Sequence, residues 1–264
     1  MGFEAAAVKQ CTYNFGVTDA KSFLAVANVL EGVGVSAYLG AAKFIMNKDY
    51  LTTAGSILTV ESRHSAYLRR NQNPALSPFP SPFDIPLDFD EVYSLAAQFI
   101  ASCPSSNTNL PMLKAFPAIT VMPAGIAKPG DKLTLKTAKT VDAKAAYFIT
   151  STGSVMAPLS GSGCDYTVTI PDGVQKGQEY LVLTSAAAKP SDDNIVAGPA
   201  VVEIADNAFG QPQGGMSGSG GNGGSGSGSG SGASPNPYGS YGKYGSYGSY
   251  GASAGGSGKV TQIG

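Results

Sequence analysis

The sequence of 264 residues contains no tryptophan, one histidine and few charged residues, which make up 13% of the chain. Its formal net charge of −1 provides no basic surface for nucleic acid or for an anionic membrane, so we exclude both as partners. No apolar run approaches the ~18 residues that a transmembrane helix requires, and we expect no membrane span. The first residues also lack the basic and apolar segments of a signal peptide.

Cysteine is scarce, and the three cysteines (Cys11, Cys103 and Cys164) are too far apart for a zinc pattern such as Cys-x-x-Cys. Cys11 precedes the first predicted helix and Cys103 follows the last. One interpretation is therefore a disulfide that closes the helical region, which would place the protein in an oxidising compartment. The other is three unpaired, buried thiols.

Aliphatic residues are almost missing from the end of the chain, where residues 211–264 are mainly Gly, Ser and Tyr. Such a segment cannot offset the entropy of ordering, so we predict a disordered tail at 207–264. Five tyrosines recur there at every third position: Tyr238, Tyr241, Tyr244, Tyr247 and Tyr250. The tail is either a flexible linker-like segment or one that binds cell-wall polymers or itself through its tyrosine rings.

Apolar residues at three- and four-residue spacing predict a helical domain at residues 1–103. We expect helices at about 19–47, 49–70 and 88–100, separated by a short link and by a proline-rich loop at 74–86. The short link makes the first two helices antiparallel neighbours. Asp88 and Glu91 form the pattern of a capping box at the start of the third helix.

Three residues that can bind metal fall on the apolar stripes of the first two helices: Glu31 on the first, and Glu61 and His64 on the second. A carboxylate that faces a core is costly unless it is paired or bound to a metal. One Glu on one helix and Glu-x-x-His on the next are half of the ligand set of a dinuclear centre in ferritin-like bundles. We predict these three residues as metal ligands, with iron as the candidate ion, and we predict no catalytic residue.

A structural interpretation of the same residues also exists. Glu31 would hydrogen-bond Tyr38 or pair with Arg63, and Glu61 and His64 would simply bond each other. If metal does bind, three ligands hold at most one ion, and a symmetric homodimer would supply the full set because a two-fold axis duplicates every ligand.

After a linker at 104–116, the pattern changes to the two-residue period of strands, at residues 117–206. The candidate strands are 118–122, 132–136, 146–150, 166–170, 180–184 and 200–204. Short strands joined by turns, with no helix between them, predict an antiparallel β-sandwich of immunoglobulin-like type. The fold class is therefore α+β, with several domains and no catalytic constellation in the β part.

Residues 11–15, 30–42 and 57–64 resemble the later half of the fungal ferritin-like proteins, which are similar to yeast and mould stress-response and plant desiccation-related proteins. The resemblance implies a four-helix ferritin-like bundle in a secreted protein whose enzymatic activity is mostly unestablished. It places Glu31 at the single Glu of the third helix, and Glu61 and His64 at the Glu-x-x-His of the fourth. We expect this chain to lack the first two helices and thus to hold half of the metal site.

Three functions follow as hypotheses. The first is a stress-associated extracellular or cell-wall protein without catalysis, which retains half of a metal site. The second is a di-iron oxidoreductase completed by another chain. The third is a structural cell-wall protein that acts through its sandwich and tail.

Overall fold

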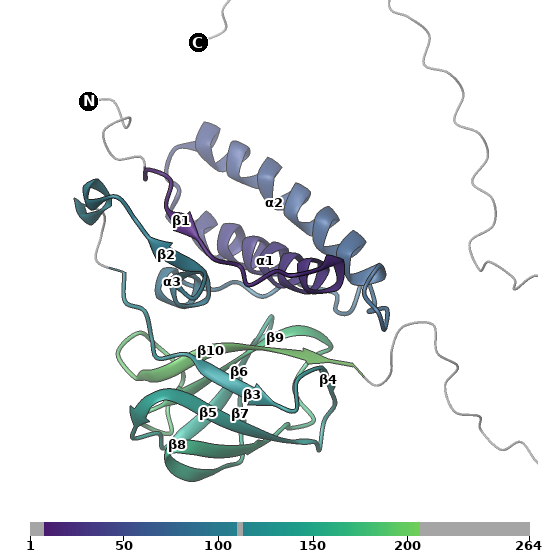
Figure 1. Cartoon of the computed structure of the whole chain (residues 1–264), viewed down its shortest axis with the longest axis vertical. Coiled ribbons are helices and arrows are strands. Elements are labelled where there is room, and N and C mark those ends of the chain that lie inside the picture. The colour runs from purple at the N-terminus through teal and green to yellow at the C-terminus, as the bar shows by residue number, and fades with distance from the viewer. Residues whose placement is uncertain (1–7, 110–112, 206–264) are drawn as a thin grey trace, which may run out of the picture. The chain divides into compact units, whose positions relative to one another are not determined.

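The computed structural model describes residues 8–109 and 113–205 of the chain (Figure 1). The helical part contains β1 (Thr12–Tyr13), α1 (Ala20–Ala41), a 3-10 turn (Ala42–Phe44), α2 (Lys48–Arg70), α3 (Phe89–Ala97), β2 (Ile100–Ser102) and a second 3-10 turn (Ser105–Asn109). The strands that follow are β3 (Ile119–Met122), β4 (Ile126–Ala127), β5 (Lys132–Val141), β6 (Ala145–Thr150), β7 (Gly153–Ala157), β8 (Leu159–Thr169), β9 (Gly177–Thr184) and β10 (Ile195–Ile204). The predicted tail at 207–264 lies outside the described residues.

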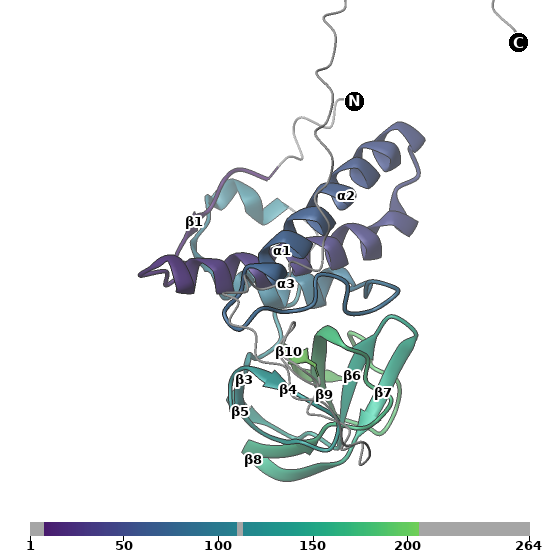
Figure 2. The ribbon, with the colours of Figure 1, turned by 90° about the vertical axis from the view of Figure 1, so that its right-hand side faces the viewer.

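The three predicted helices are present, and their starts follow from capping. The first helix was expected to reach about residue 47, which is wrong: α1 ends at Ala41, and a 3-10 turn follows it. Asp19 caps α1, since its carboxylate accepts a hydrogen bond from the Ser22 backbone while the Ser22 hydroxyl accepts one from the Asp19 backbone. Asn47 caps α2, since its side-chain oxygen accepts hydrogen bonds from the backbones of Asp49 and Tyr50 at 2.8 and 3.2 Å. The two long helices run side by side in both views (Figures 1 and 2).

The predicted capping box of α3 is confirmed. The Asp88 carboxylate accepts from the Glu91 backbone at 2.9 Å, and the Glu91 carboxylate accepts from the Asp88 backbone at 2.9 Å. The helix was expected to reach residue 100, which is wrong. It ends at Ala97 because Ile100–Ser102 turns into β2 and pairs with β1, where Tyr13 lies opposite Ile100.

A disulfide joins Cys11, before β1, to Cys103, after β2, and closes a loop with a sequence separation of 92 residues. Of the two interpretations of the cysteines, the structure therefore agrees with the disulfide, and Cys164 is free.

We expect the Cys11→Ser/Cys103→Ser variant to lose about 2–4 kcal/mol of unfolding free energy, because the unfolded chain gains entropy when a long loop is no longer closed. Urea unfolding measures this loss. Cys164→Ser is the control, and an equal loss in both proteins would contradict the prediction.

The β part consists of two sheets, β3-β5-β8 and β4-β10-β9-β6-β7 (Figure 2). Every pair is antiparallel except β4 with β10, which is parallel. Two of the strands, β4 and β7, were not predicted. Two residues are too few for a periodic signal in β4, and Gly153 and Ser154 make β7 resemble a turn. The immunoglobulin-like assignment stays a prediction.

The core of the β part is shared by the two sheets. Leu133, Leu135 and Val168 from the smaller sheet pack in one cluster with Phe148 and Leu181 from the larger. Side chains alternate along β9, so that Leu181 joins this cluster while its neighbour Tyr180 belongs to another, which it forms with residues from the helical part. That second cluster consists of Val33, Ile85, Leu87, Leu95 and Tyr180. Both parts thus lie within one compact unit of the structure.

Close approach of backbones fixes α1 in place. A Cβ atom on Gly40 would overlap the carbonyl oxygen of Leu87, and the Leu87 backbone donates a hydrogen bond to the Ser36 carbonyl at 3.2 Å.

We expect Gly40→Ala to lower the unfolding free energy by about 1–3 kcal/mol, as overpacking does. The matched control is Gly55→Ala on α2, where no atom lies within 4 Å of the added methyl group. That change should stabilise the protein by up to ~1 kcal/mol, and equal effects of both changes would refute the prediction.

The segment Ala20–Phe44 is long and apolar enough to cross a membrane, by length and composition alone. Most of its apolar part is not buried within the described structure. Core helices of other proteins pass the same test of length and composition, so the segment does not show a membrane span. The expectation of no span stays a prediction.

Candidate metal centre

The candidate site lies between α1 and α2, where a small residue lets a carboxylate approach. Gly34 on α1 faces Glu61 on α2, and a Cβ atom at this glycine would lie 3.3 Å from the Glu61 carboxyl carbon. A larger side chain would push Glu61 outward. The glycine, which is unfavourable inside a helix, thus makes room for the acid.

The three predicted ligands come together in the structure. His64 Nδ1 lies 3.3 Å from Glu31 Oε2, and one ligand atom from each of Glu31, Glu61 and His64 lies within 4.8 Å of the others. Glu31 faces His64 and Glu61 rather than Tyr38 or Arg63, so the two pairings that the structural interpretation gave to Glu31 are not found. Helical periodicity was therefore sufficient to find this cluster.

Burial differs from what the apolar stripes suggested. The Glu31 side chain is 25% exposed and the His64 side chain is 56% exposed, so the group opens to one side instead of facing a core. A stripe identifies residues on one face of a helix, but it cannot tell whether another element covers that face. An ion at this site would keep open coordination positions.

The neighbouring Glu31 carboxyl group affects the protonation of Glu61. A hydrogen bond with Glu31 raises the pKa of Glu61 to about 7, with further contributions from burial and from the Glu31 charge, while His64 acts in the opposite direction. Two carboxylates at such close range require a proton or a cation between them. The donor set of two carboxylates and one imidazole suits iron and other divalent transition metals, so these residues fit one ion.

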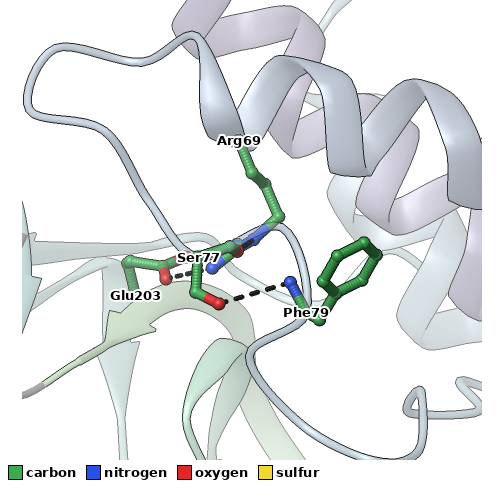
Figure 3. Close-up of polar contacts among 4 residues, drawn as sticks. All are labelled: Arg69, Ser77, Phe79 and Glu203. Carbon is green, nitrogen blue, oxygen red and sulfur yellow. Dashed lines mark hydrogen bonds and ion pairs between the residues drawn. The ribbon is translucent and has the colours of Figure 1, made fainter. Parts of the chain in front are cut away.

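Sequence reasoning missed a second polar group, which Figure 3 shows. Arg69, at the end of α2, is 4% exposed, and its guanidinium donates two hydrogen bonds to Glu203 on β10, at 2.9 and 2.6 Å. Its Nε also donates to the Ser77 carbonyl at 2.7 Å. No local signal in the sequence identifies a partner 134 positions away.

Comparison with known proteins bears on the helical part alone. Residues 2–74 match the family model described as a ferritin-like domain. No curated protein matches the chain. Among solved structures, the crystal structure of gamma-CGTase from Alkalophilic bacillus clarkii is similar with a TM-score of 0.26 and 15% identity, over 36% of this chain and 13% of that chain. The likeness is too low to inform the fold. The helical segment is therefore ferritin-like, and the fungal and desiccation-related attribution stays a prediction.

Proposed function

We propose that this protein is a ferritin-like, stress-associated extracellular protein that binds one divalent metal ion, with iron as the first candidate, and does not catalyse a reaction. The observation that carries the proposal is the placement of Glu31, Glu61 and His64, whose ligand atoms lie within 4.8 Å of one another. They are the one such group within residues 8–109 and 113–205. The match of residues 2–74 to a ferritin-like domain supports the same interpretation.

The chain's own residues would act on the ion in simple ways. Glu31 and Glu61 would neutralise its charge, and His64 would add a nitrogen ligand through the ring atom that now faces Glu31. Binding would displace the proton of Glu61, whose pKa is about 7, so metal affinity should rise as the pH rises through 7. A bound ferrous ion would supply one-electron chemistry, but the proposal assigns this chain no substrate.

Binding of ferrous iron under anaerobic conditions tests the proposal. We expect the folded protein to retain about one ion per chain, and we expect Glu61→Ala to abolish retention because one of three ligands is lost. Asp142→Ala is the control, since its side chain is 83% exposed and belongs to a surface ion pair with Lys144. Calorimetry and metal analysis after desalting give the stoichiometry. A folded protein that retains no iron would refute the proposal.

A homodimer is the partner that the open site favours. A two-fold axis beside the α1–α2 pair would give four carboxylates and two imidazoles around one space. Apolar side chains exposed on these helices, such as Phe23 at 56% and Tyr67 at 71%, favour cover by a second chain. Light scattering with and without iron measures the association, and a monomer at every concentration would exclude this partner.

The second candidate function is a di-iron oxidoreductase whose remaining ligands come from another chain. The open side of the site, where the His64 side chain is 56% exposed, is the observation that favours it. Oxygen consumption by the iron-loaded protein separates the two candidates, because a protein that only binds metal would consume oxygen no faster than free ferrous ion does.

The third candidate is a structural cell-wall protein that acts through its β part and tail. The disulfide between Cys11 and Cys103 supports an oxidising, extracellular or cell-wall location. The arrangement of the strands in two sheets, β3-β5-β8 and β4-β10-β9-β6-β7, supports the proposal that the β part is an immunoglobulin-like sandwich. Such a sandwich would serve as a recognition module. Wall preparations that retain the full chain but not a variant ending at residue 210 would favour the tail as the binding segment.

A further inference from the structure

A cavity of about 330 Å³ lies beside the metal candidate but does not include it. Its walls come from α1, from the end of α2, from the proline-rich loop at 78–85 and from the start of β9. Nothing in the function proposed above uses this space. Its volume falls at the lower end of the range that small-molecule sites occupy.

The floor of the cavity is a fixed network of hydrogen bonds. The Ser36 hydroxyl and the Tyr180 hydroxyl lie 2.9 Å apart, and Gln178 Nε2 donates to the Tyr180 hydroxyl at 3.0 Å. The same amide lies 3.3 Å from the Val29 carbonyl, against Gly32, which has no side chain to displace it. These bonds hold the polar groups in place before any ligand arrives, which lowers the entropic cost of binding.

One wall is equally fixed. Arg69 lies in its two-pronged pair with Glu203 and also holds the carbonyl of Ser77, where the loop begins (Figure 3). The Phe79 backbone in turn donates to the Ser77 hydroxyl at 3.3 Å. Pro78 and Pro80 flank this phenylalanine and restrict its backbone. The arginine thus positions the loop instead of offering a free charge.

The rim of the cavity carries two exposed aromatic rings. Phe79 is 79% exposed and Phe83 is 68% exposed, and both line the cavity on a loop that five prolines stiffen. An exposed aromatic ring beside a cavity offers a flat surface on which the apolar face of a ligand can pack. Phe79 and Phe83 are therefore candidates for ligand contact.

The mouth of the cavity carries charges of both signs. Arg63 and Lys176 line it as cations, and Asp84 lines it as an anion. Burial raises the pKa of Glu179, another lining residue, to about 8, so that this carboxyl is mainly neutral at pH 7. A ligand with many hydroxyl groups would find both hydrogen-bond donors and acceptors on these side chains.

We propose that this cavity binds an oligosaccharide. The rings of Phe79 and Phe83 would pack on the C–H faces of the sugar, and Arg63, Asp84 and Gln178 would hydrogen-bond its hydroxyl groups. The combination of flat aromatic surface, side chains that donate and accept hydrogen bonds, and fixed polar groups is what this class of ligand requires. None of the three candidate metal ligands lines the cavity.

Calorimetric titration of the full chain with cellohexaose, chitohexaose and laminarihexaose, and with inorganic phosphate, tests the proposal. We expect at least one of the three sugars to bind with a Kd of about 1 mM or lower, and phosphate not to bind. Phe79→Ala/Phe83→Ala and, separately, Arg63→Gln should each weaken binding at least about tenfold. These side chains are exposed, so the unfolding midpoint should remain that of the wild type.

Phe23→Ala is the matched control, because this ring is 56% exposed on α1 but does not line the cavity. It should bind the sugar as the wild type does. The proposal is overturned if none of the three sugars binds, if phosphate binds instead, or if the Phe79→Ala/Phe83→Ala variant retains wild-type affinity. The Phe79→Ala/Phe83→Ala variant should retain iron as the wild type does. A failure to bind sugar would therefore not count against the proposal that Glu31, Glu61 and His64 bind a metal ion.

Discussion

Arg69→Met will lower the free energy of unfolding by about 3–5 kcal/mol, the cost of breaking a buried ion pair. The guanidinium is almost fully buried, and its two hydrogen bonds to Glu203 are the polar link between α2 and β10. Without it, the Glu203 carboxylate, whose side chain is only 15% exposed, has lost its partner. The carbonyl of Ser77 loses its donor as well.

A double-mutant cycle with urea unfolding checks this prediction. Arg69→Met/Glu203→Met should be more stable than Arg69→Met alone, because an unpaired buried charge costs more than two apolar side chains do. The control is Lys128→Met, which removes a surface pair with Asp131 at 2.8 Å and should cost less than about 1 kcal/mol. A loss for Arg69→Met as small as that of the control would mean that the pair contributes nothing.

The second large effect is a dependence of stability on pH. Glu179 is 1% exposed, its Oε2 atom has no hydrogen-bond partner among the described residues, and burial raises its pKa from 4.5 to about 8. The charge of Glu203 on the adjacent strand acts in the same direction. The folded state therefore binds the proton more tightly than the unfolded chain does.

The sign of the effect follows from these two pKa values. The contribution of the neutral carboxyl to stability is complete below pH 4.5 and is lost as the pH rises through about 8. Each pH unit in that window costs about 1.4 kcal/mol, so the total is on the order of 4–5 kcal/mol. We expect Glu179→Gln, which cannot ionise, to unfold with a higher free energy than the wild type at pH 9.

The difference in unfolding free energy between the wild type and Glu179→Gln reports the contribution of Glu179 separately from that of the other acidic residues. Burial also raises the pKa of Glu91 to about 7, and burial together with neighbouring acids raises that of Asp192 to about 6, so both add to the pH dependence of the two proteins alike. Urea unfolding at half-unit steps from pH 4 to pH 9 measures the difference. Parallel curves for the two proteins would show that Glu179 titrates normally.

Local patterns were sufficient to place the three helices and the three candidate ligands, but not the ends of the first and third helices. The three- and four-residue spacing placed Glu31, Glu61 and His64 on facing stripes, and the contact between His64 and Glu31 agrees with that placement. The Asp88 capping box also has a local signature, because both of its hydrogen bonds lie within one helical turn. Such features depend on residues near one another in the chain.

The features that the sequence did not predict depend on distant partners. Arg69 and Glu203 are 134 positions apart, and Gly40 is small because of the Leu87 carbonyl and not because of its own helix. The pairing of β4 with β10 similarly needs the position of another strand. The exposure of the His64 side chain could not be predicted either. An apolar stripe indicates which face of the helix a residue lies on, but not whether another element covers that face.

The alternation of side chains along β9 has a consequence for how the molecule comes apart. One strand serves two interiors, since Leu181 packs between the sheets while Tyr180 packs with Val33 of α1. Cleavage of the chain within residues 104–116, followed by separation of the fragments, would expose to water the apolar side chains of each fragment that pack against the other. Denaturation should accordingly proceed as a single step, and neither fragment should be recoverable as a soluble, independently folding piece.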